Sequence, residues 1–247
     1  MPKNNIGRTP SGTSRRRGQT GNEQTGDDTL VDLVEVRDQA QGFLDRNRNT
    51  ILGVAFGLAA IAIGFVLYQT LYKAPRAATA AAELQFAQVQ FERDSFQLAL
   101  ANPGNNRLGF LDIIDEYGST PSGNLANYYA GVSYLNLGEY AAALDYMNSF
   151  KPKGSVLAVT KYGVMGDAES ELGNFDAALG YYDDAVAAAA ENYSLGGYYL
   201  NKLALLHRHQ GRTAEALAAF ERLKTDYGQS PEAREADKYI ALLEAAQ

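Results

Sequence analysis

Hydrophobic and polar residues follow two different patterns along this chain. From Ile51 to Tyr72 there are 22 consecutive residues without a charge, and as far as Tyr68 no strongly polar side chain lies on any face. About 20 apolar residues of helix cross a bilayer core, so this run predicts a membrane-spanning helix. Elsewhere, apolar residues recur at helical spacing among polar ones. Because no alternating strand pattern of useful length occurs, the chain is expected to be all-α.

Two alternatives to a spanning helix fit the run less well. A cleaved signal peptide has a shorter apolar stretch near the N-terminus, whereas this run begins after fifty residues. The alanines at positions 74, 77, 78 and 80–82 nevertheless leave cleavage open. A buried core helix of a soluble protein would carry polar positions at helical spacing, and the run has none before Gln69.

The segments before the run differ in composition. Residues 1–28 are rich in Gly, Asn, Thr, Ser and Gln and cannot bury enough apolar surface to offset chain entropy, so they are predicted to be a disordered cytoplasmic tail. Residues 29–48 are predicted to form a juxtamembrane amphipathic helix with Asp28 or Thr29 as its N-cap. Its apolar positions are Leu30, Leu33, Val34, Phe43 and Leu44.

The spanning helix is assigned to residues 49–72 and an exit helix to residues 73–104. The exit segment is alanine-rich between positions 77 and 101, which predicts a helix that continues the span outward, with Pro75 as a site for a kink. One face of the span has small residues, which let a second helix approach closely. This predicted docking face consists of Gly53, Gly57, Ala60 and Gly64.

Charge is divided unevenly around the span. Residues 1–48 have a net charge of +1, whereas residues 73–247, with 14 Lys and Arg against 22 Asp and Glu, have a net charge of −8. Basic residues favour the cytoplasmic side. The arginines before the span therefore predict a single-pass protein of the bacterial inner membrane with a cytoplasmic N-terminus and a periplasmic C-terminal domain. The acidic C-terminal region argues against nucleic acid as a partner. Reversed topology stays open.

Three segments of the C-terminal half align with one another. Residues 138–144, 173–179 and 211–217 read GEYAAAL, GNFDAAL and GRTAEAL, and their glycines are 35 and 38 residues apart. Seven residues before each glycine is a small residue, and an aromatic residue or methionine follows each motif. A small residue lets paired helices pack closely, and the glycine allows a left-handed turn between them. This layout resembles the tetratricopeptide repeat, a helix–turn–helix unit of about 34 residues.

A second similarity brackets these repeats. Residues 110–121 and 220–231 each place a glycine after a helix, followed by Thr or Ser as a cap and Pro at the first helical position. Residues 107–117 are therefore predicted to be the second helix of a degenerate repeat. Residues 231–247 are predicted to be a terminal helix that covers the last exposed face of the stack. Together, residues 105–247 are expected to form a tetratricopeptide repeat-like α-solenoid.

Residues able to carry catalysis are sparse. The two histidines, His207 and His209, are two apart and point to different sides of a helix, which is unsuitable for a metal pair. The adjacent acids at 115–116 and 183–184 are typical of solvated helix surfaces, and the chain has no phosphate-binding glycine loop. The chain is therefore predicted not to be an enzyme and to have no cofactor, metal site or catalytic residue. An enzyme site between repeats remains the alternative.

A protein-binding groove is predicted instead. In tetratricopeptide repeats, groove residues come from the first helix of each unit, and the mixture of polar and apolar groups found here suits an extended polypeptide. By register, the groove residues are Tyr128, Val132, Leu135, Asn136, Asp167, Ser170, Glu171, Tyr198, Asn201, Leu205, Arg208 and His209.

The order of these parts resembles the ancillary SecYEG translocon subunit family, whose members have one inner-membrane span and a periplasmic tetratricopeptide-like domain. The resemblance is carried by the sequence FLDRN at 43–47, by the glycines and Tyr68 of the span, and by alanines 77, 78 and 81. It extends from Val34 to the C-terminus. The arginine-bearing N-terminal extension departs from the short cytoplasmic end typical of the family.

The resemblance implies an accessory factor without catalytic activity. Its partners would be Sec translocon subunits, a membrane-anchored periplasmic chaperone of the prolyl-isomerase type, and nascent exported chains. The main alternative is a periplasmic tetratricopeptide repeat scaffold for cell-envelope assembly, unrelated to the translocon.

Overall fold

The computed structural model describes residues 27–190 and 192–245, with side chains from Glu35 onward. All regular structure in these ranges is helical, as expected, and no strand occurs there. The chain divides into two units between Val66 and Leu67. The expected tail, residues 1–28, lies almost entirely outside the described residues. The domain boundaries expected from the sequence stay predictions.

The described part of the first unit is one helix, α1 (Asp27–Leu67), whose last residue already belongs to the second unit. No break separates the expected amphipathic segment from the apolar run. Helix is continuous from Glu35 to Phe91, and in the described part of the chain this is the one helix long and apolar enough to cross a membrane. Its apolar side chains are exposed, as for Phe56 (74%) and Ile61 (70%).

A π-helical turn, η1 (Tyr68–Lys73), opens the second unit and leads into α2 (Ala74–Phe91). Pro75 lies in the first turn of α2. A proline inside a helix lacks an N–H and crowds the carbonyl group four residues earlier, here that of Leu71. The wider turn accommodates this crowding, so the helix continues through the predicted kink site.

The exit helix is shorter than the sequence predicts. It ends at Phe91 rather than at position 101, because the chain turns at 92–95 with Asp94 at φ 55°. Helix α3 (Phe96–Ala101) then folds back, placing the Phe96 ring edge-on to Phe91, 5.5 Å away. Aspartate adopts left-handed backbone angles more readily than most residues, which allows this turn without glycine.

Helices α2 and α3 pack with α4 (Phe110–Tyr117) and α5 (Pro121–Asn136) around one apolar cluster. Phe110 and Ile113 are fully buried in it. The helix expected from position 107 begins at 110, because Gly109 is its extended N-cap and donates its N–H to Asp112 Oδ2 at 3.1 Å. Arg107, before the cap, pairs with Glu83 of α2 at 2.9 Å. The predicted cap of α5 is confirmed, because Thr120 Oγ1 accepts a hydrogen bond from the Gly123 N–H at 3.1 Å.

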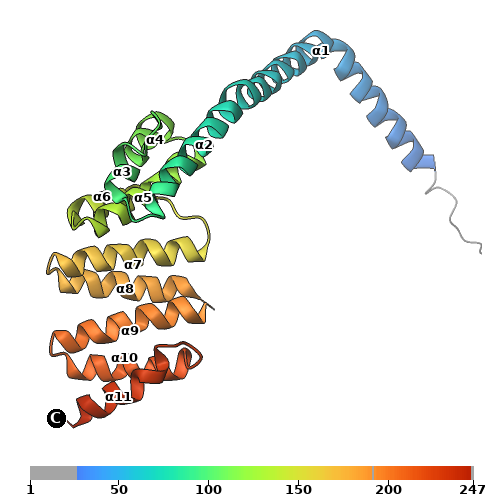
Figure 1. The fold of residues 1–247 in the computed structure, drawn as a ribbon. Coiled ribbons are helices and arrows are strands. Elements are labelled where there is room, and N and C mark those ends of the chain that lie inside the picture. Colours follow the sequence, from blue (N-terminus) through green and yellow to red (C-terminus); the bar gives the residue numbers. More distant parts are fainter. Residues whose placement is uncertain (1–26, 191, 246–247) are drawn as a thin grey trace, which may run out of the picture. The chain divides into compact units, whose positions relative to one another are not determined.

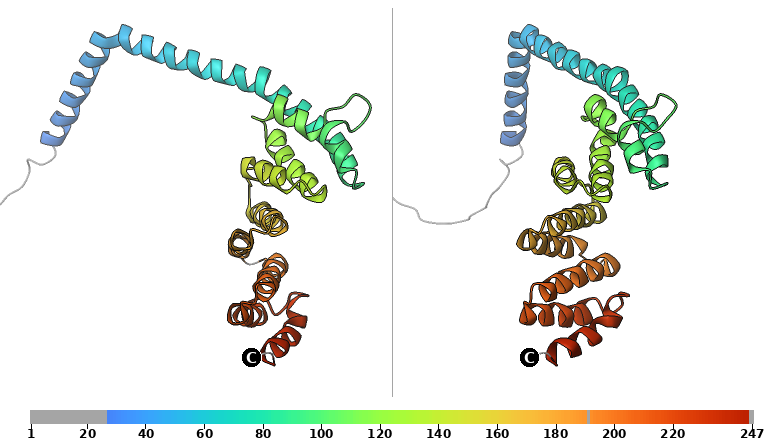
Figure 2. Two further views of the ribbon diagram at one scale, coloured as in Figure 1. Left: turned by 90° about the vertical axis from the view of Figure 1, so that its left-hand side faces the viewer. Right: turned by 60° about the vertical axis from the view of Figure 1, so that its left-hand side comes forward.

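The repeat helices follow as antiparallel pairs (Figures 1 and 2). They are α5 with α6 (Tyr140–Ser149), α7 (Ser155–Glu171) with α8 (Phe175–Ala189), and α9 (Tyr193–His209) with α10 (Thr213–Asp226). The three predicted turn glycines, Gly138, Gly173 and Gly211, have φ of 79°, 79° and 70°. In each turn, the residue after the glycine donates its N–H to a carbonyl five residues back, which closes the first helix.

The small residues allow close packing as predicted. A Cβ atom at Gly131 would lie 2.9 Å from Met147, and one at Gly166 would lie 2.6 Å from the Tyr182 ring. Each partner follows sixteen residues later. At the same offset in the third repeat, Ala204 and Phe220 are both fully buried in one cluster.

The array ends with α11 (Ala233–Glu244) packed on α10. This terminal helix begins two residues later than predicted, and Gln247 lies outside the described residues. The N-cap is Glu232 rather than the predicted Ser230, although Ser230 Oγ still accepts a hydrogen bond from the Ala233 N–H at 3.3 Å. The Tyr239 ring of α11 stacks on Phe220 at 4.9 Å, which covers the last apolar face.

Candidate functional site

The first helices of successive repeats lie beside one another. Helix α5 contacts α7, and α7 contacts α9. Their second helices, α6, α8 and α10, each pack against the first helix of the same repeat. This two-layer arrangement gives α5, α7 and α9 a common inner surface, which is where the sequence register places the predicted groove.

Asp167 is the centre of a polar cluster on that surface. Its Oδ1 accepts hydrogen bonds from the Tyr182 hydroxyl at 2.7 Å and from Lys202 Nζ at 2.6 Å. The Asp167 and Lys202 side chains are each 28% exposed. Burial, followed by the charge of Asp167, raises the pKa of Tyr182 far above its ordinary value. Tyr182 therefore stays a hydrogen-bond donor, and one carboxylate joins α7, α8 and α9.

An open pocket of 290 Å³ adjoins this cluster. It brings together four of the predicted groove residues, Leu135, Asp167, Ser170 and Glu171. Three further lining residues, Tyr140, Tyr182 and Lys202, were not among the predicted ones. The Tyr140 hydroxyl donates to Glu171 Oε2 at 3.3 Å. The pocket thus offers carboxylates, hydroxyls, one ammonium group and one aliphatic side chain within one space.

The remaining predicted residues of α5 are mostly structural. Tyr128 is half-buried, its ring lies 5.4 Å from that of Phe150, and burial raises the pKa of its hydroxyl. Val132 packs with Leu135 against the apolar cluster around Met147. Asn136 is exposed and donates from Nδ2 to the Val132 carbonyl at 2.8 Å.

The predicted residues of α9 point to different neighbours. Tyr198 is 41% exposed, and Lys202 Nζ lies over its ring at 5.2 Å from the centroid. The Arg208 guanidinium lies over the Tyr239 ring of α11 at 4.7 Å, whereas the His209 ring meets Phe175 of α8 at 5.7 Å. Asn201 and Leu205 are partly buried, and Leu205 packs against the main core. The structure therefore gathers Tyr198 with the Asp167 cluster and directs Arg208 and His209 elsewhere.

Nothing in the sequence marked Lys202 as a groove residue except its position on the first helix of a repeat. Its partner Asp167 is 35 residues earlier, which is one repeat length. Residues one repeat apart on first helices lie on adjacent helices. A search for opposite charges at that separation would have found this pair.

The predicted docking face of the span lies on α1. A Cβ atom at Gly53, Gly57 or Gly64 would meet no atom of the described residues within 4 Å, and Ala60 is exposed. The docking role of this face stays a prediction.

The described residues contain no group of three or more His, Cys, Asp or Glu side chains that could hold a metal ion. His207 is partly buried, and its Nδ1 is buried without a hydrogen-bond partner in the part of the chain that the structure describes. Burial lowers the pKa of His207, which favours the neutral ring. The geometry around it is that of a packed side chain.

Comparison with known proteins agrees with this architecture. Residues 125–151 and residues 164–231 each match a family model described as tetratricopeptide repeat. No curated protein matches the chain. Repeats of this kind are typical of protein-interaction scaffolds. The chain is thus an all-helical, tetratricopeptide repeat-containing protein with one long apolar N-terminal helix.

Proposed function

We propose that this protein is a membrane-anchored scaffold whose inner repeat surface binds an extended segment of another protein. The pocket around Asp167 carries this proposal, because it places fixed donors and acceptors beside Leu135 on adjacent first helices. Backbone amides and carbonyls of an extended peptide match such a surface. The exposed apolar side chains of α1 support anchoring, since a water-exposed apolar surface of this extent is unfavourable.

A photocrosslinker at Glu171, which lines this pocket, tests the groove. The matched control replaces Asp184, an exposed acidic residue on the second-layer helix α8. Irradiation of cells that express the full-length protein should yield discrete protein adducts at Glu171, identified by mass spectrometry, and not at Asp184. Equal adducts at both positions would contradict binding through the inner surface.

The family resemblance described above supplies the first partner to examine. We propose that the scaffold is an accessory factor of the Sec translocon that links the channel to periplasmic chaperones. Affinity purification from mild detergent should then recover channel subunits. Recovery of none, under conditions that preserve other membrane complexes, would favour the alternative of a scaffold for cell-envelope assembly, and the proteins recovered would identify that assembly.

The proposed topology is tested separately. Protease added to spheroplasts should digest the repeat domain if it is periplasmic, whereas a protected repeat domain would show the reverse orientation. A carbonate wash tests anchoring, since release of the full-length protein from membranes would exclude a spanning helix.

A further inference from the structure

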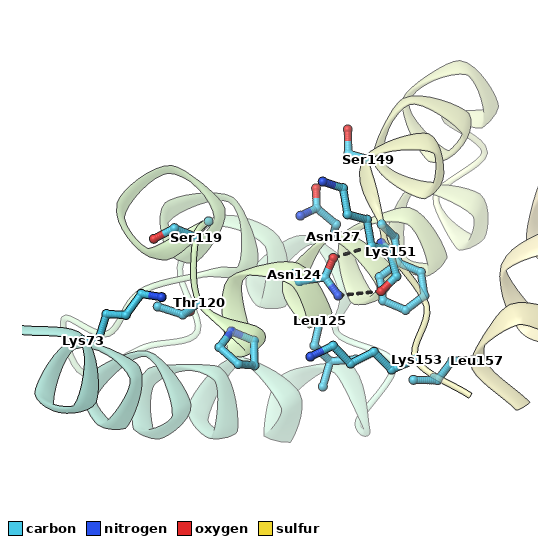
Figure 3. A pocket seen from close by; sticks show the side chains of 13 residues that line it. Lys73, Ser119, Thr120, Asn124, Leu125, Asn127, Ser149, Lys151, Lys153 and Leu157 are labelled. Atoms are coloured by element: carbon cyan, nitrogen blue, oxygen red, sulfur yellow. Dashed lines mark hydrogen bonds between the residues drawn. The ribbon is translucent and has the colours of Figure 1, made fainter. Parts of the chain in front are cut away.

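The second unit contains a second and larger open pocket, of 620 Å³, away from the inner repeat surface. Its walls come from the end of η1, the turn between α4 and α5, the first turns of α5, and the loop from α6 to α7 with the helix ends beside it (Figure 3). The side chains that matter are three lysines, Lys73, Lys151 and Lys153. Figure 3 shows Lys73 and Lys153 extending toward one another from opposite sides of the pocket.

The charge of this pocket contrasts with that of the region around it. Residues 73–247 carry 22 acidic side chains against 14 basic ones, yet no carboxylate is among the residues that line the pocket. None of the three lysines forms an ion pair with another residue that the structure describes. The N-terminal end of α5, capped by Thr120, adds the positive end of a helix dipole. The pocket is therefore suited to an anionic group.

The loop that carries two of these lysines is held in place. Asn124 of α5 donates from Nδ2 to the Lys151 carbonyl and accepts from the Lys151 N–H, both at 2.9 Å. Lys161 Nζ donates to the Phe150 carbonyl at 2.8 Å, and the Phe150 ring is 1% exposed. Because the backbone is held at Phe150 and at Lys151, Lys151 is anchored at the rim of the pocket before any ligand arrives, and Lys153 follows two residues later.

The chain places this pocket directly beside the end of the apolar run. Lys73 follows the last residue of that run, Tyr72. An adjoining pocket of 380 Å³ shares Lys73 and residues 119–121 and is also lined by Tyr68, Tyr72 and Arg76. The rings of Tyr68 and Tyr72 stack at 5.5 Å, and Arg76 lies over Tyr72. Tyrosines and basic residues after an apolar helix are typical of the headgroup layer of a membrane.

We infer that the pocket lined by Lys73, Lys151 and Lys153 binds the phosphodiester headgroup of an anionic phospholipid. The inference rests on the proposed membrane anchoring and is independent of the peptide groove. Lys73 and Lys153 approach the phosphate from opposite sides, Lys151 adds positive charge at the rim, and the adjoining aromatic pocket receives the glycerol and the first part of the acyl chains. A bound lipid contacts both α2 and the loop after α6, so it fastens the first repeat to the membrane surface.

Native mass spectrometry of the full-length protein tests this. The protein is purified from nanodiscs that contain phosphatidylcholine and phosphatidylglycerol, and the lipids retained are identified. The wild type should retain phosphatidylglycerol preferentially, and a K73Q/K151Q/K153Q variant should lose this preference by roughly 10- to 100-fold. The matched control, R93Q/R234Q/K238Q, removes three exposed basic residues elsewhere and should retain it. Circular dichroism checks that both variants are folded.

Two results would overturn the inference. One is equal retention of phosphatidylglycerol by the wild type and the lysine variant; the other is an equal loss in both variants, which would indicate only the effect of net charge. Inorganic phosphate at millimolar concentration is added in a parallel arm. Displacement of the lipid by phosphate at that level would assign the pocket to a soluble anion instead.

A photocrosslinker in place of Ser119, which lines both pockets, gives a second test in native membranes without removing any lysine. A lipid adduct supports the inference, and a protein adduct in its place would overturn it. Integration into nanodiscs and resistance to carbonate report anchoring independently. An anchored protein without a lipid preference would therefore contradict the lipid site and leave the proposed function standing.

Discussion

The two junctions between successive repeats are built from different interactions. Between the second and third repeats, α8 and α9 share a cluster of 20 buried residues that extends from Val159 in α7 to Leu243 in α11. Between the first and second repeats, a smaller buried cluster of Met147, Phe150, Val164 and Met165 is combined with hydrogen bonds from Asn124 and Lys161 to the connecting loop. The first matched repeat segment, 125–151, ends within this loop, and the second, 164–231, begins within α7.

This difference predicts two levels of cooperativity in one array. Apolar clusters couple helices over several repeats, because each buried side chain touches many neighbours. Hydrogen bonds to a loop couple only the elements that they join. We therefore expect α7–α11 to unfold as one unit and the first repeat to separate from it more readily.

The largest effect is expected from Leu200→Ala. Leu200 is fully buried in the large cluster, and deleting a buried leucine side chain costs about 2–5 kcal/mol. Chemical denaturation in mild detergent, followed by circular dichroism, should show one destabilised transition for the second and third repeats. A loss confined to the α9–α10 pair would contradict their cooperative coupling to α7 and α8.

A matched pair of glycine substitutions should sharpen the comparison. A Cβ atom at Gly166 would lie 2.6 Å from the buried Tyr182 ring, so Gly166→Ala should cost about 1–3 kcal/mol through overpacking. At Gly131 a Cβ atom would lie 2.9 Å from the flexible Met147 side chain and 3.2 Å from the Ala143 carbonyl oxygen. Both variants gain about 1 kcal/mol of helix propensity, which should offset more of the strain at Gly131, because Met147 can move more easily than the Tyr182 ring. Unfolding midpoints of the two variants measure the difference, and equal destabilisation would refute the distinction.

Asn124→Ala should act locally. It removes both hydrogen bonds to Lys151, which corresponds to about 1–2 kcal/mol. Hydrogen exchange should increase in residues 150–154 and in α6, while α9 and α10 keep their protection. Asn136→Ala is the control, because Asn136 bonds only within α5. Faster exchange throughout the array would show that the two junctions are equally cooperative.

The smallest effect concerns alkaline pH. Burial raises the pKa of Tyr182 and of Tyr199 above the ordinary value of 10.0. Because their pKa is higher in the folded than in the unfolded chain, these tyrosines contribute stability that is fully present below about pH 10. That contribution is lost as the pH rises through the folded-state pKa. Tyr182→Phe should cost about 1 kcal/mol at neutral pH and should flatten the alkaline decline. Unchanged pH dependence in this variant would assign the decline to other groups.

The sequence correctly predicted those turns in which the backbone conformation itself restricts which residue can occupy a position. Left-handed turns at Gly138, Gly173 and Gly211 leave a periodic signal because few residues other than glycine adopt them readily. The end of α2 at Phe91 left no such signal, since Asp94 makes that turn and the packing of Phe96 on Phe91 accompanies it. Tertiary contacts of this kind are not visible in local sequence.

The lining of the pocket around Asp167 was predicted in part for the same reason, and its role as a binding groove stays a prediction. Repeat register identified Asp167, Ser170 and Glu171 because first helices repeat their orientation from unit to unit. Register could not show that Arg208 covers Tyr239 of the terminal helix, because that helix belongs to no repeat. It also could not anticipate that the loop after α6 places Lys151 and Lys153 near Lys73.

The contact between Lys202 and Asp167 has a consequence for selectivity. The only ammonium group lining this pocket already has a carboxylate at 2.6 Å, so an acidic guest would compete with an internal counterion rather than meet an unpaired charge. Recognition there must depend mainly on shape and on neutral donors and acceptors. Ionic strength should consequently have little influence on the affinity of the proposed groove for an extended polypeptide.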